Sequence, residues 1–127
     1  MNLLLDTHAL IWFTEGSDKL SSKAKQEISK SSNSKFISIV SLWEIAIKVS
    51  KNKLEIKQTF QELNRFLFLN SIQVLGIEFN HLNSLLDLPQ HHGDPFDRLL
   101  IAQAVSEKLT IISADRHFTA YSVEVIW

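Results

Sequence analysis

Four acidic residues in the chain follow short apolar segments or lie near the start of helical ones: Asp6, Glu44, Asp97 and Asp115. Carboxylate oxygens are hard ligands that suit Mg²⁺ or Mn²⁺, and the chain has no cysteine that would compete for the metal. Carboxylates that cluster repel one another, so such a cluster needs a cation. One or two bound divalent ions could activate a water molecule and neutralise charge on a phosphoryl group. The chemistry that these residues favour is hydrolysis of a phosphodiester bond.

The elements between these acids must bring them together. Apolar and β-branched runs predict five strands, at residues 2–5, 36–40, 74–77, 110–113 and 123–126. Helical spacing of apolar residues predicts helices at about 22–31, 41–51, 58–69, 78–87 and 94–107, with shorter helical turns at 7–13 and 115–120. Strands that alternate with helices indicate an α/β fold with a mostly parallel sheet of about five strands, flanked by helices. Ligands of such sheets bind outside the carboxyl ends of the strands, where we expect the acids to lie.

Three of the acids also have a purely structural interpretation. The segment Ser41–Glu44 has the spacing of a capping box, in which Glu44 would satisfy the start of its own helix. Asp6, at the end of a strand, could form a turn, and Asp115 could cap the helical turn that follows it. The four acids are more convincing together than singly, because all of them lie at one edge of the predicted sheet.

Two acids stand three residues apart at the start of the 94–107 helix. Asp94 followed by Pro95 is typical of an N-cap, and we expect Asp94 to be a cap rather than a ligand. Asp97 borders the apolar stripe that includes Leu100, where an acid that is neither paired nor metal-bound is costly. We therefore expect Asp97 to have a functional role.

Composition limits the class of protein. A chain of 127 residues fits one domain, 1–127, and 45% hydrophobic with 21% charged residues is a globular balance. Only three glycines are present, and they form no phosphate-cradling loop, which argues against use of nucleoside triphosphates. No apolar run approaches the roughly 20 residues that cross a bilayer, and no secretion signal is recognisable, so we expect a cytoplasmic protein.

Charge is distributed unevenly although the net charge is only −1. Residues 1–57 carry nine lysines and six acids, whereas residues 58–127 carry four basic residues and eight acids. Seven of the lysines form two groups: Lys19, Lys23, Lys25 and Lys30, then Lys48, Lys51 and Lys53. These groups could follow a phosphate backbone, and a solvated helix face is an equal alternative.

Four motifs resemble those of PIN domains, in the order of that family. They are Leu4–Leu10, Ser41–Glu44, Asp94–Ala104 and Ile111–Asp115, and together they span nearly the whole chain. The third is long and specific, whereas the others are short. Ser113 stands where relatives often carry threonine, and the hydroxyl is kept.

The resemblance implies a PIN-like fold with an acidic pocket for one or two Mg²⁺ or Mn²⁺ ions. In this interpretation Asp6 and Asp97 hold the principal metal, and Glu44 and Asp115 complete the pocket directly or through water. Ser113 orients a ligand or a water by hydrogen bonding. All five residues are therefore candidate catalytic residues.

The resemblance also implies partners. PIN domains of the VapC-like branch are the toxins of bacterial toxin–antitoxin pairs, so we expect an RNA substrate, a cognate VapB-like antitoxin and a homodimer. The expected reaction is endonucleolytic hydrolysis that leaves a 5′-phosphate. The alternative is a non-catalytic PIN-like module that binds RNA or a protein partner without cleaving it.

Other phosphoryl chemistry fits less well. A phosphoacceptor receiver domain would need paired acids after the first strand and a lysine after a late strand, and the chain has neither. A phosphatase with an aspartyl nucleophile would need a second aspartate two residues after Asp6, where His8 stands.

Several residues near the acids could contact substrate or solvent. His91 and His92 are adjacent on a loop, where neighbouring side chains rarely face one ion, so we expect both to be exposed to solvent. Arg98 and Arg116 each follow an acid of the candidate site. Either could contact phosphate or an antitoxin carboxylate, with surface ion pairing as an equal alternative.

Overall fold

Five short parallel strands form the central sheet of the protein, whose computed structural model describes residues 1–127. They are β1 (Asn2–Leu5), β2 (Ser34–Ser38), β3 (Ile72–Leu75), β4 (Thr110–Ile112) and β5 (Val125–Ile126). The strand order is β3-β2-β1-β4-β5, and every neighbouring pair is parallel. This order confirms the predicted α/β fold and places the carboxyl ends of β1 and β4 side by side.

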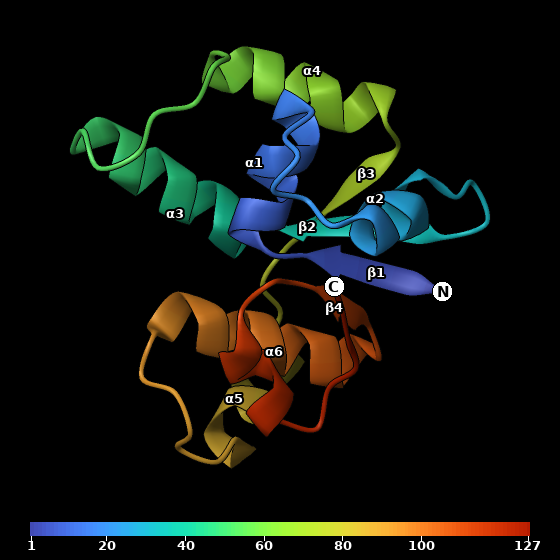
Figure 1. The fold of residues 1–127 in the computed structure, drawn as a ribbon. Coiled ribbons are helices and arrows are strands. Elements are labelled where there is room, and N and C mark those ends of the chain that lie inside the picture. The colour runs from blue at the N-terminus through green and yellow to red at the C-terminus, as the bar shows by residue number, and fades with distance from the viewer.

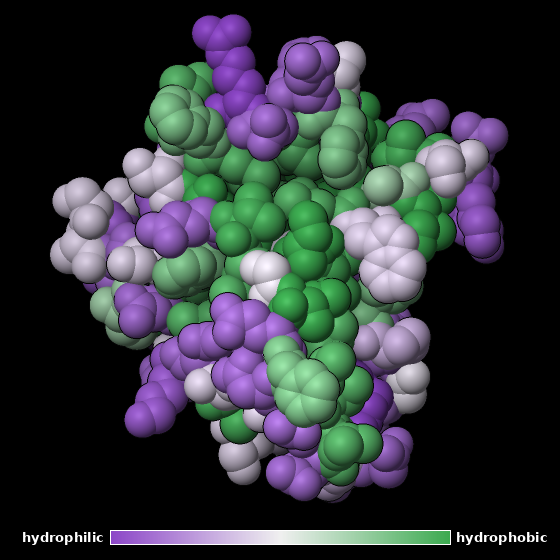
Figure 2. All heavy atoms as spheres, turned by 180° about the vertical axis from the view of Figure 1, so that it is seen from behind, coloured by the Kyte–Doolittle hydropathy of each residue, from purple (hydrophilic) through white to green (hydrophobic).

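Helices cover both faces of the sheet (Figure 1). One face carries α1 (Thr7–Glu15), α2 (Ser22–Ser29), α3 (Ile39–Ser50) and α4 (Phe60–Leu69). The other carries α5 (Phe79–Asp87), α6 (Pro95–Glu107) and the short 3₁₀-helix η1 (Arg116–Ala120). Seen from behind, hydrophobic side chains gather across the middle of the molecular surface (Figure 2). None of the helices has the length and apolar character needed to cross a bilayer.

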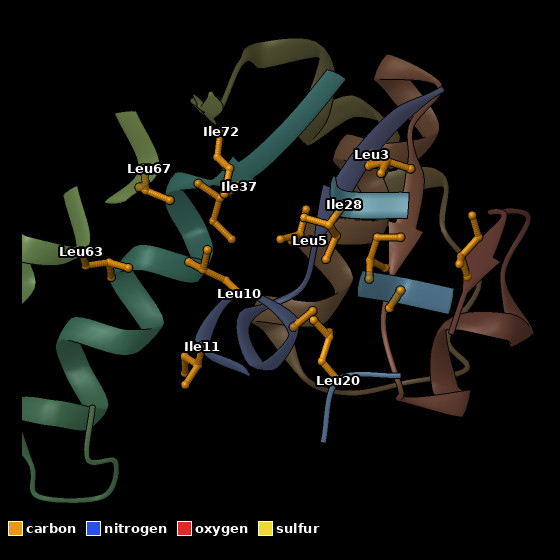
Figure 3. Packing of buried hydrophobic residues seen from close by; sticks show 14 of the residues in the cluster. Leu3, Leu5, Leu10, Ile11, Leu20, Ile28, Ile37, Leu63, Leu67 and Ile72 are labelled. Carbon is orange, nitrogen blue, oxygen red and sulfur yellow. The ribbon is translucent and has the colours of Figure 1, made fainter. Parts of the chain in front are cut away.

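The sheet separates two hydrophobic cores, and the leucines of β1 contribute to both. Leu3 and Leu5 point into the core beneath α1 and α4, whereas Leu4 points into the core beneath α6. Figure 3 shows the first core, in which Ile37 of β2 and Ile72 of β3 lie close to side chains of α1 and α4. A strand buried on both faces reads as an uninterrupted apolar run, which is why its sequence does not alternate.

The boundary between β2 and α3 differs from the prediction. We expected a strand to Val40 and a helix from Ser41, but the strand ends at Ser38 and the helix begins at Ile39. Ser38 is the N-cap: its Oγ accepts a hydrogen bond from the Val40 amide and donates one to Gln103 Oε1. The β-branched residues that suggested a strand therefore form the first helical turn, because a buried serine stops the strand before them.

Three further boundaries also shift. Strand β3 is Ile72–Leu75 rather than 74–77, because Ile72 packs in the core and pairs with Lys35. Helix α1 extends to Glu15 and ends at Gly16, whose left-handed φ of 62° suits glycine. Strand β5 is limited to Val125–Ile126. None of these shifts moves an acid away from the edge of the sheet.

Candidate metal centre

Asp6 lies where β1 ends and α1 begins. Its Oδ1 accepts a hydrogen bond from the Ala9 amide at 2.8 Å, which makes Asp6 the N-cap of α1. Its Oδ2 accepts a hydrogen bond from the Ser113 hydroxyl. The residue is 8% exposed. Burial raises the pKa of Asp6 above its ordinary value, although the bonds from Ser113 and Ala9 lower it in part.

Ser113 links two of the acids. It follows β4 and is completely enclosed, and its Oγ donates to Asp6 while accepting a hydrogen bond from the Asp115 amide at 2.9 Å. The parallel pairing of β1 with β4 brings these two segments together, although 107 residues separate the bonded pair. The hydroxyl therefore orients a carboxylate of the candidate site.

Asp97 lies in the first turn of α6 and is half-buried. Its amide donates to Oδ1 of Asp94 at 3.1 Å, so the predicted N-cap role of Asp94 is confirmed. Burial raises the pKa of Asp97, and the charges of Asp94 and Asp115 raise it further. The hydrogen bond from His92 Nε2 to Asp97 Oδ2, at 2.9 Å, lowers that pKa in part.

Asp115 is the N-cap of η1 and is more open than the other acids. Its Oδ1 accepts hydrogen bonds from the His117 amide at 2.9 Å and from the His117 imidazole at 2.8 Å. Burial raises its pKa, but these bonds and the nearby histidine charges outweigh burial, so the pKa of Asp115 is lowered overall. The charge of Asp115 raises the pKa of both Asp6 and Asp97, so it is close enough to interact with each of these acids.

Glu44 lies on α3 and does not cap that helix. Its Oε1 accepts from the Thr7 hydroxyl at 2.7 Å, and its Oε2 pairs with Lys48 one turn later. The capping-box interpretation of Ser41–Glu44 is wrong, because Ser38 is the cap and the buried Ser41 hydroxyl has no hydrogen-bond partner. Thr7 directly follows Asp6, so this contact brings α3 to the same end of the sheet.

Hydrogen bonds and charge thus gather four of the five predicted residues: Asp6, Ser113 and Asp115 are linked directly, and Asp97 interacts with Asp115 through its charge. Glu44 joins them through Thr7. These carboxylates are a donor set that fits a hard divalent ion, and burial raises the pKa of two of them, Asp6 and Asp97. Three tighter groups of potential ligands do not contain Asp6 or Glu44, and two of these groups combine His92 with acids at this end of the molecule.

His92 differs from the expectation, and Arg98 forms no ion pair. His91 is exposed as predicted, but the exposure predicted for His92 is wrong, because it is half-buried and bonded to Asp97. Arg98 donates to the Pro89 carbonyl at 2.9 Å and to the Tyr121 hydroxyl at 3.3 Å, so it holds the loop before α6 rather than an acid. The sequence carried no periodic signal for this loop.

The family of the chain follows from comparison with known proteins. The family model described as "PIN domain" matches residues 3–124, and the chain therefore belongs to the PIN-domain family. This finding confirms the resemblance that the four motifs indicated. The comparison with curated proteins found no match.

Solved structures with the same fold include three bacterial complexes. VapBC2 from Rickettsia felis, bound to a promoter DNA fragment, is 18% identical, with 99% of this chain and 98% of that chain covered and a TM-score of 0.74. A toxin–antitoxin complex from Klebsiella pneumoniae is 22% identical, with coverage of 98% and 96% and a TM-score of 0.64. FitAcB from Neisseria gonorrhoeae is 16% identical, with the same coverage and a TM-score of 0.69. At these identities the likeness establishes the fold.

Proposed function

We propose that the protein is a Mg²⁺- or Mn²⁺-dependent endoribonuclease that acts as a VapC-like toxin. The observation that carries this proposal is the pair of carboxylates at the carboxyl edge of a parallel sheet, the buried Asp6 and the half-buried Asp97, whose pKa values are both raised by burial. Burial of a carboxylate without a full cationic partner is costly, and a divalent ion would offset that cost. Membership of the PIN-domain family supports a nuclease.

The residues of the pocket have distinct roles in this proposal. Asp6 and Asp97 hold the principal ion, and Glu44 and Asp115 complete the pocket directly or through water. Ser113 fixes the orientation of the Asp6 carboxylate through its hydrogen bond. The bound ion supplies activation of a water molecule and neutralisation of the phosphoryl charge. With the ion bound, in-line attack of that water on phosphorus would break the bond to the 3′ oxygen. The 3′ oxygen would take up a proton and leave as a hydroxyl, and the other fragment would carry a 5′-phosphate.

Two kinds of macromolecular partner belong to the proposal. The similar folds are those of toxin–antitoxin complexes, which supports a VapB-like antitoxin as the inhibitor of this chain. The surface exposes large apolar side chains on α4, β3 and α5, including Phe68, Val74, Phe79 and Leu86. Exposed apolar surface of this kind is typical of proteins with protein partners, and it supports both an antitoxin and a second copy of the chain.

Cleavage of a labelled pool of total RNA by the purified protein tests the activity. Wild type with Mg²⁺ or Mn²⁺ should give discrete fragments, and EDTA should abolish them. Asp97→Asn should lower the rate at least about a hundredfold, since a catalytic metal contributes several kcal/mol to the transition state. Asp18→Asn, a change at an exposed acid outside the pocket, should leave the rate unchanged.

Two outcomes would contradict the proposal. Full cleavage by Asp97→Asn would remove this acid from the chemistry. RNA that binds wild type but stays intact in every metal, with no antitoxin detected by mass spectrometry in the preparation, would favour a PIN-like binding module instead.

A further inference from the structure

Two histidines that the proposed nuclease chemistry does not use lie against the acidic pocket. The rings of His92 and His117 are 4.5 Å apart between centroids, and their planes differ by 7°. His92 comes from the loop before α6, and His117 is the second residue of η1. Each ring donates one N–H to a carboxylate: His92 Nε2 to Asp97 at 2.9 Å and His117 Nδ1 to Asp115 at 2.8 Å.

Both imidazoles have a hydrogen-bonding pattern that lets a metal ion replace a ring proton. Each ring places one nitrogen against a carboxylate, and an ion bound there would take the place of the shared proton. His92 Nδ1 and His117 Nε2 have no hydrogen-bond partner in the protein, so each ring could carry its proton on that nitrogen while the other nitrogen binds the ion. Asp115 is 38% exposed and His117 is 64% exposed in their side chains, so the cluster is open to ions from solvent.

The donors are close enough to share one ion after a small adjustment. One ligand atom from each of His92, Asp115 and His117 lies within 4.8 Å of the other two. A tetrahedral zinc ion binds its ligands at about 2 Å and would draw these donors closer together. Because one ion cannot lie in the planes of two stacked rings, one imidazole must also turn, and the exposed His117 side chain has room to do so.

We propose that His92, Asp115 and His117 form a binding site for Zn²⁺ beside the acidic pocket. Two imidazoles and one carboxylate are a donor set for zinc and similar transition metals, whereas Mg²⁺ prefers oxygen ligands alone. The carboxylate of Asp97 is bonded to His92 and could supply the fourth ligand of the tetrahedral ion. The donor set therefore distinguishes this site from the pocket of Asp6 and Glu44.

A second histidine–acid group in the protein lacks this pattern. Glu78, His81 and Glu107 also place ligand atoms within 4.8 Å of one another. However, His81 Nδ1 accepts a hydrogen bond from the Glu78 amide at 2.9 Å, so Nε2 must carry the proton that it donates to Glu107 at 2.8 Å. Both ring nitrogens are engaged, and metal at Nε2 would leave the ring without a proton. We therefore assign the ion to the His92 cluster alone.

Zinc at this site would compete for an acid of the nuclease pocket. Asp115 belongs to both donor sets, so Zn²⁺ held by the histidines would remove it from the Mg²⁺ pocket and inhibit cleavage. This inhibitory consequence rests on the proposed nuclease function, whereas the binding of zinc does not.

Calorimetric titration of untagged, EDTA-treated protein with Zn²⁺, in the presence of millimolar Mg²⁺, tests the binding. Wild type should bind one Zn²⁺ ion. His92→Gln and His117→Gln should each weaken the affinity by about ten- to a hundredfold, since loss even of an outer partner of a metal ligand has that effect. His91→Gln is the matched control, because it removes an exposed imidazole from the same loop. The affinity of His91→Gln should equal that of wild type, and Asp6→Asn should still bind one Zn²⁺ ion, because Asp6 is not a ligand of this site.

The titration separates this proposal from the nuclease proposal. Absence of zinc binding by wild type, or equal binding by His92→Gln and His117→Gln, would overturn the site, even if RNA is still cleaved. Loss of zinc binding in Asp6→Asn alone would place the ion in the acidic pocket and would also overturn it. Circular dichroism of each variant distinguishes loss of a ligand from loss of the fold.

Discussion

Asp6 combines a structural role with the proposed chemical one. Its carboxylate caps α1 and is oriented by Ser113, yet burial raises its pKa. A neutral asparagine could keep the cap, because asparagine is a good N-cap residue. Asparagine would lose the charge, and its Nδ2 would donate to Ser113 Oγ where Oδ2 of Asp6 now accepts a hydrogen bond. Only the proposed metal chemistry requires the charge.

The pH dependence of stability follows from the raised pKa of Asp6. The folded protein holds this proton more tightly than the unfolded chain, so ionisation favours the unfolded state. The contribution of Asp6 to stability should therefore be lost as the pH rises from the ordinary pKa of 3.8 through the raised pKa of the folded state, and it should stay lost at neutral pH. In EDTA, Asp6→Asn should be more stable than wild type at neutral pH. It should lose this advantage below pH 3.8, which is the ordinary pKa of the aspartate side chain.

Urea unfolding of both proteins at several pH values measures this difference. Asp18→Asn is the control, because its carboxylate is exposed. Mg²⁺ should raise the midpoint of wild type and leave Asp6→Asn unchanged, since only the native wild-type pocket binds the ion. An Asp6→Asn variant that is less stable at neutral pH would show that the carboxylate stabilises the fold.

The sequence identified the acids but not their histidine partners. Asp6, Asp97 and Asp115 were recognisable because each stands beside an apolar run or a helix start. The contact of His92 with Asp97 depends on the loop conformation that Arg98 holds through the Pro89 carbonyl. A loop has no periodic pattern, so residue types alone could not place this imidazole.

At the scale of elements, helix α6 carries Asp97 into the site, and Asp94 fixes where that helix begins. Asp94→Ala should lower the free energy of unfolding by about 1 kcal/mol, the usual cost of a lost N-cap. Asp94→Ser should retain most of the stability that the cap contributes. Serine retains the cap oxygen but not the carboxylate. If Asp94 is only a cap, Asp94→Ser should also keep wild-type affinity for Mg²⁺.

Chemical denaturation and Mg²⁺ titration of the two variants separate these roles. Loss of Mg²⁺ affinity in Asp94→Ser, with stability preserved, would make Asp94 a ligand as well as a cap. Equal stability of Asp94→Ala and wild type would contradict the cap contribution.

Element types were predictable from the sequence, but several boundaries were not. Alternating runs of apolar strands and periodic helices were sufficient for a parallel sheet. The error at β2 arose because Ile39 and Val40 favour a strand locally, while Ser38 and Gln103 form a buried hydrogen bond that starts the helix. Gln103 lies 65 residues further along the chain, which is a contact that local patterns cannot reveal.

At the scale of the whole molecule, the exposed apolar side chains bear on assembly. We expect a homodimer, and native mass spectrometry should detect a species of twice the 14.6 kDa of one chain. The protein without antitoxin should form this dimer at micromolar concentration. A single species of one chain mass across that range would contradict the homodimer and leave the apolar surface to other partners.

The uneven charge of the chain has a partial structural explanation. Lys30 pairs with Glu27 and Lys48 pairs with Glu44, so two of the seven grouped lysines are engaged within the protein. Lys48 lies beside the candidate pocket through this contact. The remaining lysines keep both interpretations, a phosphate contact or a solvated helix face.

The acids at the edge of the sheet are proposed to hold a divalent ion. Electron paramagnetic resonance of Mn²⁺ tests whether the ion binds there, without knowledge of the RNA target. Free Mn²⁺ gives a sharp spectrum that broadens when the ion binds. We predict saturable binding of one or two ions to wild type and to Asp18→Asn, and a loss of at least about tenfold in affinity in Asp6→Asn and Asp97→Asn. Equal binding by all four proteins would contradict the assignment of the metal to this pocket.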